Sequence, residues 1–128
     1  MKRTLLGLLV LGVVSSPAEK KRKPPEVTVL EATAHRGADT LTVDGKVRNT
    51  GEKPLSGLLI VIDCREPSHQ VVTTRRAPVE DESLAPAAET DFHVEFEAPP
   101  RAVEITLGAA DTAGHEFRLD KGGPYPIE

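Results

Sequence analysis

The segment from Leu41 to Cys64 constrains the fold of this chain more than any other segment. Apolar and polar residues alternate over residues 41–48 and stop at Asn49-Thr50-Gly51, and a second apolar run follows over residues 57–64. A period of two places successive side chains on opposite faces of a β-strand. Because Asn-Thr-Gly tolerates left-handed backbone, we expect the chain to leave the first strand there in that conformation. Two such strands joined by an arch predict an all-β sandwich.

Several further segments carry strand signals, and no stretch of ten residues after residue 18 fits a helix. The expected strands span residues 27–34, 40–49, 57–64, 70–75, 89–97, 102–110 and 115–119, and the inward face of the first is ambiguous. About seven short strands fit an immunoglobulin-like sandwich of two antiparallel sheets, with strands one, two and five in one sheet and the other four in the second. Residues 77–88 are expected to form a long loop. The tail after residue 119 is expected to fray, although Tyr125 and Ile127 are able to dock.

The residues around the arch also resemble a known family. The run from Val43 to Gly51, the Pro54-Leu55 pair and the apolar strand after them are similar to bacterial immunoglobulin-like modules called FxLYD domains. The leucine-x-proline-glycine segment of that family matches residues 84–87 before the strand that contains Phe92, with Ala87 in place of the glycine. Adhesion-related bacterial immunoglobulin-like domains share the strand followed by Asn-Thr-Gly and are the alternative. Either resemblance implies a sandwich over roughly residues 27–119 with no shared catalytic chemistry.

The first 18 residues have the pattern of a secretory signal peptide. Lys2 and Arg3 precede an apolar run over residues 5–14, and small residues then favour cleavage after Ala18. Such a run reaches only ~15 Å as a helix, about half of a bilayer core, so we expect no stable membrane anchor. The expected order is a signal peptide (1–18), a basic and proline-rich linker (19–26), the sandwich (27–119) and a tail (120–128). This order predicts a secreted or periplasmic protein, although the basic residues 20–23 beside the cut disfavour translocation.

Charge and cysteine content narrow the function further. Cleavage after Ala18 leaves 14 of the 16 basic residues against 20 acidic ones, a net charge of −6. The chain lacks the basic face with aromatic partners that nucleic-acid binding needs, so residues 20–23 are interpreted as a solvated linker, with a polyanion- or membrane-binding tail as the alternative. Cys64 is the only cysteine, so the chain has no internal disulfide. Its place in the apolar row predicts a buried thiol that packs as a small hydrophobe.

Few residues are candidates for chemistry. Ser68 and His69 are neighbours on an expected turn with no acid to orient them, so we expect no serine hydrolase and no enzyme of another kind. The weak metal candidates are His93, Glu95 and Glu97, which share one face of a strand. Successive residues of that face lie ~6.6 Å apart, a wide spacing for ligands of one ion, so we expect a solvated surface and no cofactor.

One expected sheet face is low in charge. If the row that ends in Cys64 points inward, alternate residues of that strand and of the strand over residues 102–110 point outward. The candidate partner face comprises Leu59, Val61, Thr106, Gly108 and Ala110. Such a face is typical of a protein-docking or homodimer surface, and the alternative is that the loop or the tail covers it. We therefore expect an exported, non-catalytic interaction module. The alternative function is a metal-handling periplasmic protein that uses surface histidine and glutamate residues.

Overall fold

The computed structural model describes residues 23–128, so the expected signal peptide and most of the basic tract lie outside the described residues. All secondary structure in this range is β-structure. The strands are β1 (Val27–Arg36), β2 (Thr40–Asn49), β3 (Leu55–Ser56), β4 (Leu58–Arg65), β5 (Val71–Pro78), β6 (Ser83–Leu84), β7 (Glu89–Glu97), β8 (Glu104–Asp111), β9 (Glu116–Phe117), β10 (Leu119–Asp120) and β11 (Tyr125–Pro126). Over residues 23–128 there is no helix with the length and apolar character needed to cross a membrane.

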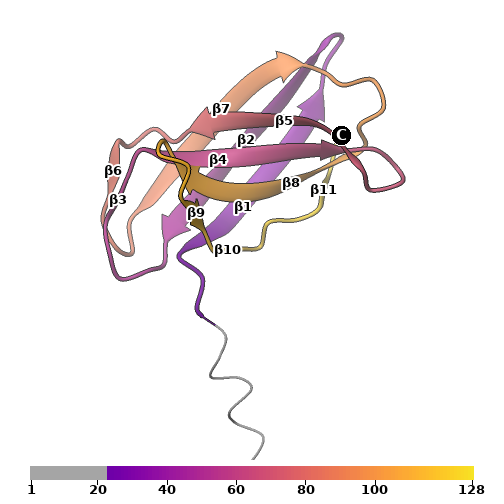
Figure 1. Ribbon diagram of the computed structural model, residues 1–128. Coiled ribbons are helices and arrows are strands. Elements are labelled where there is room, and N and C mark those ends of the chain that lie inside the picture. The colour runs from indigo at the N-terminus through magenta and orange to yellow at the C-terminus, as the bar shows by residue number, and fades with distance from the viewer. Residues whose placement is uncertain (1–22) are drawn as a thin grey trace, which may run out of the picture.

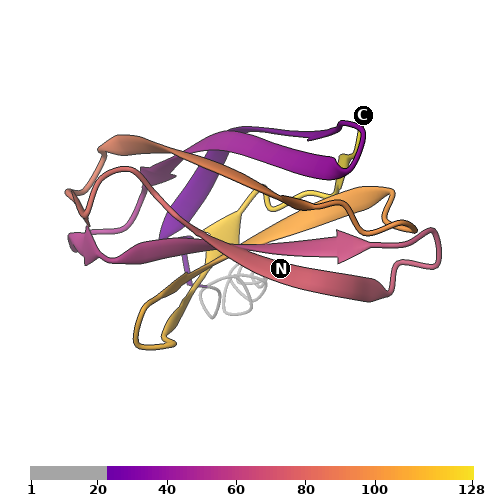
Figure 2. The same cartoon turned by 90° about the horizontal axis from the view of Figure 1, so that it is seen from above.

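The longer strands form two layers that face each other (Figure 1 and Figure 2). The first sheet has the order β10-β1-β2-β7, the second has the order β11-β8-β4-β5 with β9 beside β8, and β3 pairs with β6. The predicted sandwich is confirmed, as is the division of its first six strands between the sheets. The seventh predicted strand is divided: β9 pairs with β8, whereas β10 crosses to the first sheet and runs parallel to β1.

The core lies between the inner rows of β2 and β4. These rows contain Leu41, Val43 and Val47 on β2 and Leu58, Ile60 and Ile62 on β4, each at most 2% exposed. Burying a side chain of this size contributes roughly 1.5–3 kcal/mol to stability. Cys64 continues the row of β4, and burial raises the pKa of its thiol to about 11 because it disfavours the thiolate. The prediction that Cys64 packs as a small hydrophobe is confirmed.

A β-bulge explains why the inward face of β1 is ambiguous in the sequence. The register between β1 and β2 shifts between Val29 and Glu31, so one extra residue interrupts the alternation. Val29 points into the core before the bulge and Ala34 does so after it, whereas Leu30 is 42% exposed. A single period of two therefore does not describe this strand.

Asn49 holds the arch through its side chain. Its amide nitrogen donates to the carbonyl oxygens of Lys53 and Leu84, both at 2.9 Å, and its side-chain oxygen accepts from the N–H of Gly51 at 3.0 Å. The expectation of left-handed backbone over residues 49–51 was wrong, because the positive φ of this connection, 62°, lies at Gly57. The buried Asn49 amide fixes the arch against the loop before β7, so its role is hydrogen bonding.

Segments that the sequence assigns to a loop and a fraying tail contribute strands. β5 continues to Pro78, and β6 lies within residues 77–88. In the tail, β11 pairs with β8, and the N–H of Ile127 donates to the carbonyl of Val103 at 2.9 Å. Tyr125 and Ile127 pack against the core, as the docking alternative predicted. The expectation of a fraying tail was wrong because its backbone groups pair with both sheets.

Replacing Asn49 by alanine is expected to lower the free energy of unfolding by about 3 kcal/mol, because three buried hydrogen bonds are lost together. Urea unfolding of the variant measures this loss. The matched control is Thr50→Ala at the exposed neighbouring position, where the expected loss is below about 1 kcal/mol. Equal losses in the two variants would contradict the role assigned to Asn49.

Ala87 has a φ of 72°, a left-handed backbone that costs an L-residue roughly 1–2 kcal/mol and glycine almost nothing. Ala87→Gly is therefore expected to raise the free energy of unfolding by about 0.5–1 kcal/mol, after the greater freedom of glycine in the unfolded chain is subtracted. Thermal or urea unfolding measures the change. Ala85→Gly, at an exposed position without a positive φ, should lower stability, and a loss in both variants would refute the argument.

Candidate functional site

The five residues of the predicted partner face lie together on the outer side of the second sheet. Leu59 lies opposite Ala110 and Val61 lies opposite Gly108 in the pairing of β4 with β8. Ala110 is 6% exposed, the other four residues are half-buried, and none of the five belongs to the core cluster. The structure thus brings the candidate residues together outside the core.

The neighbouring strand adds residues that the sequence did not place on this face. Arg76 of β5 lies opposite Val61, and Pro78 lies opposite Leu59. The two segments named as a cover lie elsewhere, because β6 pairs with β3 and β11 continues the sheet beside β8 (Figure 1). The partner face therefore has an apolar centre with a cation on its β5 side.

The outer face of the first sheet carries a ladder of opposite charges. Arg48 pairs with Glu89 at 2.9 Å, and Lys46 approaches Asp91 to 4.0 Å. Each pair joins residues directly opposite each other on β2 and β7. Exposed pairs of this kind contribute less than about 1 kcal/mol each, but like charges would meet if the register slipped. The ladder therefore favours the observed register on a solvated face.

The structure brings together two of the three metal candidates. The His93 ring nitrogen Nε2 lies 3.6 Å from a carboxylate oxygen of Glu95, whereas Glu97 lies opposite Thr40. Asp44 on β2 contacts Nδ1 of His93, a partner that the sequence of one strand does not reveal. Among the described residues, no three histidine, cysteine or acidic side chains are grouped in a way that could hold a metal ion. The hydrogen bond and charge of Asp44, with a smaller effect of Glu95, raise the pKa of His93.

Ser68 and His69 bind different acids. The hydroxyl of Ser68 donates to Glu66 at 2.8 Å, and Nδ1 of His69 lies 3.1 Å from an oxygen of Glu104. Glu66 also accepts from the guanidinium of Arg101 at 2.7 Å, and these two donors, Arg101 first, lower the pKa of its carboxyl. The two side chains thus serve a turn and are not arranged as nucleophile and base.

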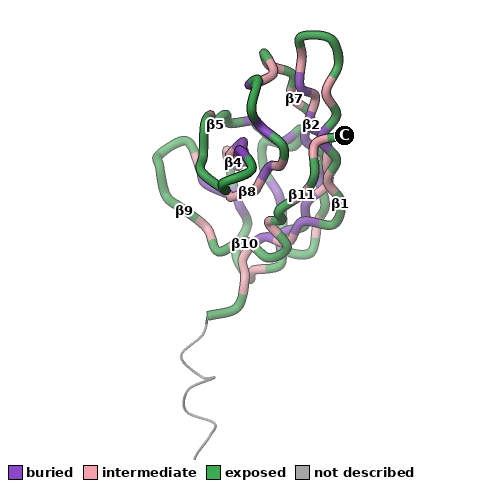
Figure 3. Tube along the Cα trace, turned by 90° about the vertical axis from the view of Figure 1, so that its right-hand side faces the viewer, coloured by how far each residue is buried: buried purple, intermediate pink, exposed green. Residues whose placement is uncertain are grey.

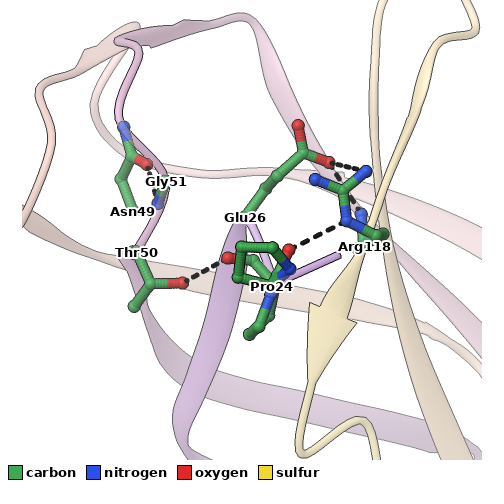
Figure 4. A network of polar contacts seen from close by, with 7 residues as sticks. Pro24, Glu26, Asn49, Thr50, Gly51 and Arg118 are labelled. Atoms are coloured by element: carbon green, nitrogen blue, oxygen red, sulfur yellow. Dashed lines mark hydrogen bonds and ion pairs between the residues drawn. The ribbon is translucent and has the colours of Figure 1, made fainter. Parts of the chain in front are cut away.

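A cavity of about 520 Å³ lies where the arch meets the segment before β1. Its polar groups bind one another (Figure 4). Thr50 donates to the carbonyl of Pro25 at 3.3 Å, and Nε of Arg118 donates to that of Pro24 at 2.8 Å. The carboxylate of Glu26 accepts from the backbone N–H of Arg118 at 3.0 Å. These contacts fasten residues 24–26, which the sequence assigns to the linker, to the sandwich.

The side of the sandwich between β5 and β7 is a feature that sequence reasoning missed. Phe96, expected in the core, is only half-buried, and the guanidinium carbon of Arg75 lies 5.4 Å from its ring centroid. This is a cation–π contact across the gap between the two sheets. The alternation of β7 predicts that Phe96 points inward, but it does not reveal that the sandwich is open beside it.

The ion pair between His93 and Asp44 predicts a pH dependence of stability. Because the pKa of His93 is raised in the folded state, its contribution is complete below the unfolded value near 6.5 and is lost as the pH rises through the folded value. The stability difference between wild type and His93→Gln should thus be larger at pH 5.5 than at pH 9. An NMR titration should show a raised pKa that Asp44→Asn lowers and that added zinc leaves unchanged. Equal differences at the two pH values would contradict the pairing.

Comparisons with known proteins support the fold alone. The chain matches no family model and no curated protein. Among solved structures, IrmA from Escherichia coli is similar over 82% of this chain and 86% of that chain, with 12% sequence identity and a TM-score of 0.50. A similarity to a beta-glucosidase from Kluyveromyces marxianus covers 82% of this chain and 15% of that chain, with 12% identity and a TM-score of 0.36, and supports no argument. The resemblance to FxLYD domains stays a prediction, and the chain is similar to IrmA in fold.

Proposed function

We propose that this chain is an exported, non-catalytic immunoglobulin-like module that binds a protein partner through the partner face. The single observation that carries the proposal is the low-charge outer surface of β4 and β8, on which Leu59 and Val61 stand half-buried outside the core. Export is supported by the leader pattern of residues 1–18.

The shape of the partner face suits a flat partner. Gly108 has no side chain, and a methyl group there would lie 3.7 Å from the Cβ atom of Val61. Ala110 continues this floor of small residues beside Leu59. Two aliphatic side chains above a floor of small residues leave little polar surface to desolvate, so a second apolar surface can approach closely.

A non-catalytic role is supported by the state of the polar groups. Ser68 and His69 are engaged with separate acids, and the polar atoms around the cavity of Figure 4 bind one another. Catalytic groups instead converge on a point that a substrate atom can occupy.

The metal-handling alternative has weaker support. It rests on the approach of His93 to Glu95, and Asp44 already engages Nδ1 of the same ring. All three side chains are more than half exposed, so water competes for any ion held there. We therefore favour the interaction module.

The double variant Leu59→Glu and Val61→Glu is expected to abolish partner binding and to remain folded, because both side chains lie outside the core. Affinity capture from the envelope fraction measures binding, sedimentation detects a homodimer, and far-ultraviolet circular dichroism measures folding. The matched control is Thr33→Glu and Thr42→Glu on the first sheet. Binding that survives in the double variant would contradict the proposal, as would a wild type that is monomeric and captures nothing. Loss of folding would show instead that Leu59 and Val61 belong to the core.

A further inference from the structure

The two lateral sides of the sandwich are closed to different degrees. On one side the tail pairs with both sheets, through β10 beside β1 and β11 beside β8. Further backbone bonds tie it down, from the N–H of Leu107 to Gly122 at 2.7 Å and from the N–H of Glu128 to Ala34 at 2.9 Å. This side offers little edge to another chain, since the tail occupies it.

The opposite side is open. β5 and β7 are the last strands of their sheets, and the segment after β5 joins them at one end only, through the bridge of Val79 to Phe92 and the bond from Glu80 to Asp91. Seven of the eight residues of β5 are not buried, and Ala77 is the exception (Figure 3). Backbone groups along the outer edge of β5 therefore lack a β-strand partner in residues 23–128.

The side chains of β5 suit an extended segment with negative charge. Val71 and Val72 are 46% and 41% exposed, and Thr73 and Thr74 continue a run of residues that favour strands. Arg75 and Arg76 follow, and within residues 23–128 neither forms an ion pair with an acidic side chain. A strand with two cations and no acid is exceptional in a chain with a net charge of −4.

A small apolar pocket lies beside the same strand. Its volume is about 200 Å³, and it is lined by Val72, Thr73, Pro99, Pro100 and Arg101. Glu66 fixes the guanidinium of Arg101 through two hydrogen bonds, at 2.7 and 3.2 Å. Val72 and Arg76 lie four residues apart, ~13 Å along a strand, so one extended peptide can reach both.

Protection against pairing and self-association both fit the edge of β5 less well than an acidic partner does. Arginine, a terminal proline and the register shift near Arg65 are devices that protect edges against pairing, but they do not account for adjacent exposed valines beside an apolar pocket. A second copy of β5 would bring four arginines together without an acid from either strand. An acidic segment complements the charge of this edge, whereas a second copy does not.

We propose that the free edge of β5 takes up an extended acidic segment of a partner protein as an additional strand of the second sheet, with one apolar side chain in the pocket formed by Val72, Pro99 and Pro100. Backbone hydrogen bonds would provide the pairing, and Arg76 would select acidic residues. This inference rests on the proposed role as an interaction module but uses a surface separate from the partner face.

A library of random ten-residue peptides displayed on phage, selected on the full mature protein, tests the proposal. The expected result is enrichment of sequences in which acidic residues accompany β-branched ones. A synthetic copy of an enriched peptide should shift the NMR signals of β5, and methylation of alternate peptide nitrogens should abolish binding. Arg76→Glu should weaken binding by about tenfold or more, whereas Lys53→Glu, the same charge change at the cavity of Figure 4, should not.

Enrichment of basic or neutral sequences, or the same affinity for Arg76→Glu as for wild type, would overturn the proposal. The absence of any enriched sequence would overturn it too, as would sedimentation of a dimer that pairs through β5. The variant Leu59→Glu and Val61→Glu should retain the peptide, since its changes lie on β4. The two proposals therefore fail separately: loss of peptide selection concerns the edge, and loss of a partner on the outer sheet face concerns the proposed function.

Discussion

Burial of the alternating apolar row of β4 against the row of β2 is the interaction that the rest of the structure depends on. Ile60 and Ile62 are fully buried, and no disulfide supports the fold, because Cys64 is the only cysteine. A slip by one residue would turn Asp63 and Arg65 inward, so the burial fixes the register of β4 as well as its place. The same alternation sends Leu59 and Val61 outward. The core and the partner face are thus two consequences of one pattern.

The ends and sides of the sandwich depend on contacts between segments that are distant in sequence. The buried amide of Asn49 holds the arch and the loop before β7, and Arg118 holds residues 24–26. The tail then pairs with both sheets on one side. Because no comparable segment follows β5, the opposite side has an unpaired edge. The asymmetry between the two sides gives the molecule its second candidate surface.

The sequence predicted the sandwich and most of its sheet order because long strands with a solvated face have a clear period of two. It also placed Leu59, Val61 and Gly108 on one outer face for the same reason. Short strands such as β10 and β11 have two residues each and carry no period, so their pairing could not be predicted. The contact of Asp44 with His93 depends on the register between two strands, which one strand does not reveal. The openness beside Phe96 likewise follows from which strands are last in their sheets.

Hydrogen exchange of the backbone amides, measured residue by residue, tests most directly the claim that the sandwich is closed on one side and open on the other. We predict strong protection in β2 and β4, measurable protection at Leu107, Ile127 and Glu128 where the tail is bonded, and fast exchange at alternate amides of β5. Uniform protection along β5 together with fast exchange in the tail would contradict the account.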